Sequence, residues 1–126
     1  MNAHILVVED NPDNSKLVSW ILEDEGYEVT CVESGERCLA LLDKATFDLI
    51  LMDISLPGIS GKEGTRRIRQ IPRLQKLPIL ALTAHAIEAE QQSILNSGVD
   101  DLLTKPLNDD QLVKVIQRYV GVNSTQ

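Results

Sequence analysis

Five polar side chains stand at the ends of short, largely apolar segments spread along the sequence. They are Glu9 and Asp10 after the first segment, Asp53 after the third, Thr83 at the end of the fourth and Lys105 after the fifth. Carboxylates are ligands for hard metal ions, and a lysine and a hydroxyl are donors to phosphoryl oxygens. Chemistry of this kind requires a fold that brings the five segment ends to one place.

The three carboxylates favour a divalent-cation site. If Glu9, Asp10 and Asp53 converge, their charges repel unless a cation or a proton lies between them. Mg²⁺ takes about six oxygen ligands, and these residues offer oxygen only. Lys105 adds a charge that pairs with a phosphoryl oxygen, and Thr83 adds a hydroxyl. Asp53 is the candidate nucleophile, because carboxylates form aspartyl phosphates where a metal and a lysine absorb the phosphoryl charge.

The segments that must position these residues alternate between two patterns. Short apolar runs, typical of buried strands, occupy residues 5–8, 27–32, 48–52, 79–82 and 101–104. Amphipathic stretches bounded by helix-capping and helix-ending residues occupy residues 11–25, 34–43, 62–71, 85–97 and 109–120. The unbroken apolar character of residues 48–52 predicts a central strand, buried on both faces.

Strands that alternate with helices predict right-handed crossovers and a parallel sheet covered on both faces. Five repeats give a doubly wound α/β sandwich, a (βα)5 fold with the flavodoxin-like strand order 2-1-3-4-5. Such folds bind ligands beyond the carboxyl ends of strands one and three. We therefore expect Glu9, Asp10 and Asp53 to meet there.

The composition fits one domain of this kind. The chain has 126 residues, 43% of them apolar and 25% charged, whereas a typical domain has about 100 to 200 residues. We expect the domain to span residues 1–121 and residues 122–126 to form a C-terminal tail.

The charge balance excludes several partner classes. The net charge is −7, and residues 1–60 carry twelve acids against three bases. This sign disfavours direct binding to nucleic acid or to an anionic membrane, and no apolar run approaches the roughly 20 residues that cross a bilayer. Cys31 and Cys38 match no metal or redox spacing, and we interpret both as small packing residues in a cytoplasmic protein.

Two surface features have alternative interpretations. The basic residues between positions 62 and 76 are interpreted as a solvated helix face rather than a patch for an acidic partner. In the first helix, Trp20 lies opposite the predicted buried face, and an exposed Trp marks either a partner surface or a rim position shielded by neighbours. The residues predicted for that buried face are Leu17, Val18, Ile21 and Leu22.

Four motifs resemble those of the receiver domain of two-component response regulators. They are Val-Val-Glu-Asp-Asn at residues 7–11, Leu-Met-Asp-Ile-Ser-Leu-Pro-Gly-Ile-Ser-Gly at 51–61, Leu-Thr-Ala at 82–84 and Leu-Thr-Lys-Pro-Leu at 103–107. Each motif stands at a predicted strand end, and the resemblance extends from residue 5 to residue 120. The resemblance is to the single-domain type, similar to chemotaxis regulators.

The resemblance implies that Asp53 accepts a phosphoryl group from a histidine kinase or a histidine phosphotransfer protein. It also implies a Mg²⁺ site made by Asp10, Asp53 and the backbone carbonyl of Ser55, with Glu9 acting through bound water. Thr83 and Lys105 would bond the phosphoryl group, and the Lys105–Pro106 peptide would be cis. The protein would then be no enzyme for external substrates, because it catalyses only its own phosphorylation and dephosphorylation.

The resemblance also implies a switch in partner interactions. Movement of the Thr83 hydroxyl onto the phosphoryl group would alter residues 84–120, a surface available to a downstream target or to a second copy in a homodimer. The family often carries Tyr or Phe three residues before the lysine, whereas this chain has Leu102. We therefore expect packing rather than a hydrogen bond to transmit the change.

Three alternatives stand beside this interpretation. The chain could be a receiver portion of a larger response regulator or hybrid kinase. A flavodoxin-like electron carrier is a distant alternative, because the acidic loop at residues 9–13 would repel a flavin phosphate. An aspartyl-phosphate phosphatase would need a second acid where Ser55 stands.

Overall fold

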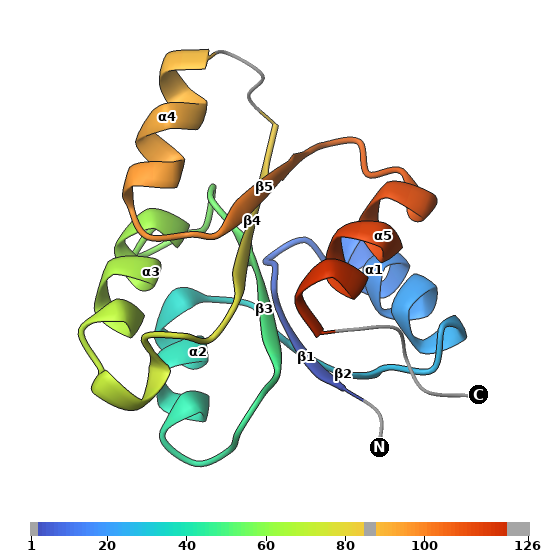
Figure 1. The fold of residues 1–126 in the computed structure, drawn as a ribbon, viewed down its shortest axis with the longest axis horizontal. Coiled ribbons are helices and arrows are strands. Elements are labelled where there is room, and N and C mark those ends of the chain that lie inside the picture. The colour runs from blue at the N-terminus through green and yellow to red at the C-terminus, as the bar shows by residue number, and fades with distance from the viewer. Residues whose placement is uncertain (1–2, 85–87, 121–126) are drawn as a thin grey trace.

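A five-stranded parallel sheet lies between two layers of helices, and the computed structural model describes residues 3–84 and 88–120 of it (Figure 1). The strands are β1 (His4–Val8), β2 (Glu28–Val32), β3 (Leu49–Asp53), β4 (Ile79–Thr83) and β5 (Asp101–Thr104). The helices are α1 (Pro12–Asp24), α2 (Gly35–Leu42), α3 (Gly61–Arg69), α4 (Glu88–Asn96) and α5 (Asp109–Val120), with a 3-10 helix, η1 (Pro72–Leu74), before β4. The strand order is β2-β1-β3-β4-β5, which confirms the predicted doubly wound architecture.

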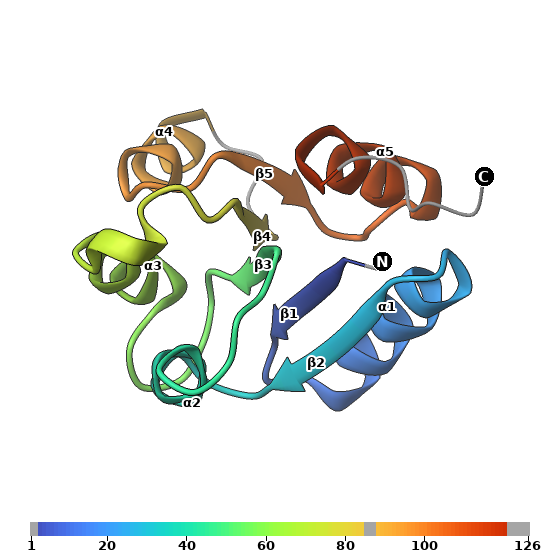
Figure 2. The same cartoon turned by 60° about the horizontal axis from the view of Figure 1, so that its bottom comes forward.

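The strands supply alternate side chains to two separate cores. In β1, Leu6 and Val8 belong to one core and Ile5 and Val7 to the other, as the two-residue period of a strand requires. Helices α2, α3 and α4 cover the first face of the sheet, and α1 and α5 cover the second (Figure 2). Strands β3 and β4 are buried along their whole length, which confirms the central position predicted for β3.

Hydrogen-bonding side chains fix where α1, α2 and α3 begin. Asn11 Oδ1 accepts the N–H groups of the second and third residues of α1, and Pro12 occupies its first position. Ser34 caps α2 and Ser60 caps α3 in the same way. These caps place the first turns of the helices at the carboxyl edge of the sheet, where the polar residues gather.

The buried face of α1 is narrower than its periodicity predicted. Val18 and Leu22 are buried, but Leu17 is 47% exposed, so its prediction as a core residue was wrong. Only the stripe formed by residues four apart faces the sheet, and Leu17 lies beside that stripe, in a hollow it shares with Leu107. Trp20 is 71% exposed, on the side of α1 where it was predicted.

One more expectation about packing needs correction. Cys31, predicted to be a packing residue, is exposed on the edge strand β2 with its Sγ 2.9 Å from Ser19 Oγ. An edge strand has one side that no neighbouring strand covers, which leaves its residues more accessible. Cys38 is buried, as predicted.

Arg69, the last residue of α3, ties several segments together at the amino-terminal ends of β4 and β5. The helix ends there, before the predicted residue 71, because Pro72 disfavours a helical conformation in the residue that precedes it. The guanidinium donates to the carbonyls of Gly98 (2.9 Å), Leu74 (3.1 Å), Gln75 (3.2 Å) and Leu77 (2.7 Å) and to Asp100 Oδ2 (2.9 Å). Asp100 Oδ2 also accepts the N–H of Ile79. The interpretation of the basic residues as a solvated face was therefore wrong for Arg69.

Two predictions fall on residues 85–87 and 121–126, which are outside the described ranges. They are the start of the fourth helix at residue 85 and the C-terminal tail at residues 122–126. Across residues 3–84 and 88–120, no helix has the length and apolar character that crossing a bilayer demands.

Candidate phosphorylation site

The sheet register brings the ends of β1 and β3 level. The last paired residues of these neighbouring strands are Val8 and Met52, so Glu9 and Asp53 follow side by side. Strand β5 ends one residue before Lys105. All parallel strands present their carboxyl ends at the same edge, and the predicted residues therefore reach one region of the surface.

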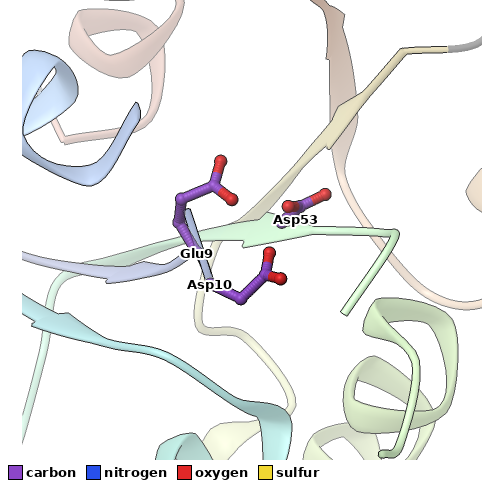
Figure 3. A group of neighbouring side chains, drawn as sticks. All are labelled: Glu9, Asp10 and Asp53. Atoms are coloured by element: carbon purple, nitrogen blue, oxygen red, sulfur yellow. The ribbon is translucent and has the colours of Figure 1, made fainter. Parts of the chain in front are cut away.

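Glu9, Asp10 and Asp53 form one acidic cluster at this edge (Figure 3). One carboxylate oxygen from each residue lies within 4.8 Å of those from the other two. Glu9 and Asp53 are each only 3% exposed, whereas Asp10 is exposed. The cluster thus has two buried members and one that faces solvent.

Lys105 lies across the two buried carboxylates. Its Nζ donates to Glu9 Oε1 at 3.0 Å and to Asp53 Oδ2 at 3.3 Å. The second oxygen of Asp53 accepts the N–H of Ser55 at 3.0 Å, and the second oxygen of Glu9 accepts the N–H of Asn11 at 3.2 Å. Each buried carboxylate therefore has an ammonium donor and a backbone donor, which together fix its orientation.

Burial and the neighbouring charges shift the pKa values of Glu9 and Lys105. Burial and the neighbouring Asp53 carboxylate raise the pKa of the Glu9 carboxyl above its ordinary value, and they outweigh the Lys105 and Asn11 donors, which lower it. Burial lowers the pKa of the Lys105 ammonium, but the hydrogen bond to Glu9 and the charge of Asp53 outweigh burial and raise it. One lysine is too little positive charge for this cluster.

The donor set suits a hard divalent cation. Three ionised carboxylates and one ammonium, −3 and +1, leave a net charge of −2 among atoms a few ångströms apart. A dication would neutralise that excess, and the exposed Asp10 leaves an open side for the waters that Mg²⁺ keeps. Carboxylate oxygens are also the ligand type that Mg²⁺ prefers.

The remaining predicted residues lie in or just after β3, β4 and β5. Thr83 is 1% exposed, and its carbonyl accepts the N–H of Lys105 at 2.7 Å, which fixes the ends of β4 and β5 side by side. The Lys105–Pro106 peptide is cis, as the resemblance implied. Leu102 packs against the core beneath α2, α3 and α4. Ser55, whose carbonyl the resemblance assigns to the metal, is exposed in the loop after β3.

Two supporting contacts were not predicted. The sequence indicated Asn11 only as the cap of α1, yet its N–H also holds Glu9. Glu36, in the first turn of α2, accepts the N–H of Ile59 in the loop between β3 and α3 at 3.2 Å. The helix-capping pattern at Asn11 lies two residues from Glu9 and could have indicated the first contact. No sequence pattern connects Glu36 with the loop.

Comparison with known families identifies the protein family of this domain. Residues 5–117 match the family model of the response regulator receiver domain. The chain belongs to the response regulator receiver family. It is accordingly a phosphoacceptor signalling domain. The match favours this interpretation over a flavodoxin-like carrier and over a phosphatase.

Receiver domains similar to this one occur in proteins of very different length. The chain is 46% identical over 121 residues to the sensor protein GacS of Pseudomonas syringae, covering 94% of this chain but only 13% of that protein. It is 35% identical to the polar-differentiation response regulator DivK of Brucella ovis, covering 96% of this chain and 98% of DivK.

A solved receiver domain from a Pseudomonas aeruginosa sensor histidine kinase has the same fold. It matches with a TM-score of 0.89 and 36% identity, over 96% of this chain and 99% of that one. That structure contains a magnesium ion coordinated in its active-site cleft.

The raised pKa of Glu9 predicts how the stability of the metal-free protein varies with pH. Because Glu9 holds its proton more tightly in the folded state, its contribution to the free energy of unfolding falls as pH rises from about 4.5 through the folded-state pKa. Asp53→Asn removes a carboxylate charge that raises the pKa of Glu9, so the variant should be more stable than wild type at pH 7, with a smaller gain at pH 5.

Urea denaturation at both pH values in excess chelator measures these differences. Glu28→Gln, which removes an exposed carboxylate far from the cluster, is the matched control and should leave the wild-type pH dependence unchanged. An equal gain for Asp53→Asn at pH 5 and pH 7 would contradict the proposed coupling between Glu9 and Asp53.

Proposed function

We propose that Asp53 of this receiver domain accepts a phosphoryl group from a phosphohistidine on a histidine kinase or histidine phosphotransfer protein. The observation that carries the proposal is the placement of Asp53, a buried carboxylate held by Lys105 and by a backbone N–H beside two further carboxylates. The domain of residues 1–121 would act in the cytoplasm, either alone or as part of a longer signalling protein.

In the proposed transfer, an oxygen of Asp53 forms a bond to phosphorus while the bond between phosphorus and the histidine nitrogen breaks. The leaving imidazole keeps that bond's electron pair, so no redox partner is needed. Lys105 would move its hydrogen bond from the carboxylate to a phosphoryl oxygen, and the Thr83 hydroxyl would bond another. The protein modifies itself and acts on no external substrate.

A Mg²⁺ ion would be held by Asp10, Asp53 and the backbone carbonyl of Ser55, with Glu9 contributing through water. Its chemistry when bound is to neutralise the phosphoryl oxygens that approach the acidic cluster. The net charge of −2 in the cluster supports a dication rather than a monovalent ion.

Incubation with acetyl phosphate and Mg²⁺ should add one phosphoryl group to the protein, detected by intact mass or, where hydrolysis is fast, by steady phosphate release. Asp53→Asn should abolish the reaction, because it removes the nucleophile. Asp10→Ala and excess chelator should each reduce it at least tenfold, because uncompensated carboxylates repel the donor.

Asp13→Ala is the matched control for Asp10→Ala, since it removes an exposed carboxylate from the first turn of α1 rather than from the cluster. Its reaction should stay within twofold of wild type. Labelling of Asp53→Asn equal to wild type would rule out Asp53 as the acceptor, and undiminished labelling in chelator would rule out the metal site.

The phosphodonor protein would dock on α1 next to the acidic cluster. Leu17 lines a hollow together with Glu9 and Lys105, and with Trp20 it lines a second hollow whose rim includes Asp24 and Asp109. An apolar strip that begins beside the phosphorylation site and has an acidic rim fits a partner surface with apolar side chains flanked by Lys or Arg.

Trp20→Ala should slow phosphoryl transfer from an isolated, phosphorylated histidine phosphotransfer domain by about tenfold or more, because buried Trp side chains dominate interface energies. Its reaction with acetyl phosphate should not change, since that donor needs no docking surface. Stopped-time transfer assays with both donors measure the two rates. Leu95→Ala, which removes an exposed apolar side chain from α4, serves as the control; an equal loss in both variants would contradict docking on α1.

Phosphorylation would be reported through α4, whose attachment is sparse. Within its described residues Ile94 is the buried side chain, and Leu95 is 39% exposed. A polar contact, from Lys62 Nζ to Ser93 Oγ at 3.1 Å, adds to the attachment. A shift of Thr83 toward the phosphoryl group would bias a helix held this weakly, altering the surface within residues 84–120 that we assign to a downstream target or a second copy.

Hydrogen exchange with and without a phosphoryl mimic bound at Asp53 tests this switch. We expect changed exchange in residues 88–107 of wild type and a much smaller change in Thr83→Ala, because the variant lacks the hydroxyl that moves. Changes confined to α1 and α2 in wild type would contradict the mechanism. Ser93→Ala, which keeps Thr83, should retain the response.

A further inference from the structure

The loop between β3 and α3 carries Ser55 and is fixed at both ends by the sheet. At its start, the N–H of Ile54 donates to Leu82 O at 3.0 Å. At its end, the N–H of Gly61 donates to Ile54 O at 3.1 Å, and Gly61 packs so closely on Asp53 O that a Cβ would collide with it. The ends of the loop therefore follow β3, while its middle extends away from the sheet.

The first turn of α2 supports the middle of this loop from outside. Glu36 Oε2 accepts the N–H of Ile59 at 3.2 Å. Gly35 lies directly beneath the same residue, since a Cβ there would be 2.7 Å from Ile59 Cγ1. Gly58 has a φ of +74°, a conformation that favours glycine, and it faces the Glu36 carboxylate. Backbone conformation, packing and a hydrogen bond thus all bring the loop against α2.

We infer that Glu36 is a positioning residue for the metal site. Its carboxylate holds the tip of the loop that carries Ser55, and the N–H of Ser55 donates to Asp53 Oδ1 at the start of that loop. This inference rests on the proposed function, in which that carbonyl is one of the Mg²⁺ ligands. Glu36 touches neither the metal nor the phosphoryl group and acts through the loop backbone.

The contact joins two segments that the chain places 23 residues apart. It therefore fixes the loop by a constraint that neither β3 nor α3 supplies. A ligand carbonyl displaced by a fraction of an ångström no longer fits the near-ideal octahedron that Mg²⁺ demands. Loss of the contact should therefore lower the affinity for Mg²⁺ without unfolding the domain.

The test compares Glu36→Ala with Glu36→Gln, since both remove the charge and only Gln keeps an acceptor for the Ile59 N–H. Mg²⁺ affinity is measured by calorimetry, and exchange of the Ile59 amide is measured by NMR in metal-free protein. We expect Glu36→Ala to bind Mg²⁺ about three- to tenfold more weakly and to exchange the Ile59 amide faster. Glu36→Gln should remain within twofold of wild type in both measurements.

Glu33→Ala is the matched control, because Glu33 is an exposed carboxylate near the same helix end whose partner is Arg37 rather than the loop. Mg²⁺ affinity in Glu36→Ala equal to that of Glu33→Ala would overturn the inference, as would an equal loss in Glu36→Ala and Glu36→Gln, which would indicate a charge effect. If the wild-type protein binds no Mg²⁺, the proposed function and the inference are both contradicted. If the wild-type protein binds Mg²⁺ with the same affinity as Glu36→Ala, only the inference is contradicted.

Discussion

Two carboxylates buried side by side, with a third at the surface and one lysine among them, impose the constraint on which this molecule depends. Glu9 and Asp53 are almost without solvent, so neither water nor salt screens their repulsion. Lys105 bridges one oxygen of each, and the backbone N–H groups of Asn11 and Ser55 donate to the other oxygens, yet the pKa of Glu9 stays raised. The site is stable enough to form and retains an attraction for positive charge.

The fold meets this constraint because β1 and β3 are apolar where they pair with each other and carry their acidic residues only at their carboxyl ends. β1 and β3 are buried from their first paired residues to Val8 and Met52, and the charged residues come one step later. The helix cap at Asn11 begins just beyond β1, so the turn that carries Glu9 and Asp10 is short and hydrogen-bonded. A sheet that is rigid in the middle thus presents its reactive groups at a fixed height.

Sequence reasoning succeeded where the signal was a period or a strand end. The alternation of patterns was enough for the topology, and residues at the carboxyl ends of parallel strands had to meet. It failed where two apolar helix faces competed, as for Leu17, and where a charged side chain bonds distant backbone, as for Arg69. A helical period does not tell which of two neighbouring stripes meets the sheet, and a run of basic residues does not reveal carbonyl acceptors in other segments. The contact between Glu36 and the Ile59 N–H was not predicted for the same reason.

The cluster around Arg69 has a mechanical consequence. Its bonds to Leu77, Gly98 and Asp100 hold β4 and β5 at the ends where these strands begin, while Thr83 and Lys105 stand where they finish. A rearrangement that leaves these bonds intact would displace β4 and β5 less at these ends than at the carboxyl ends beside Asp53.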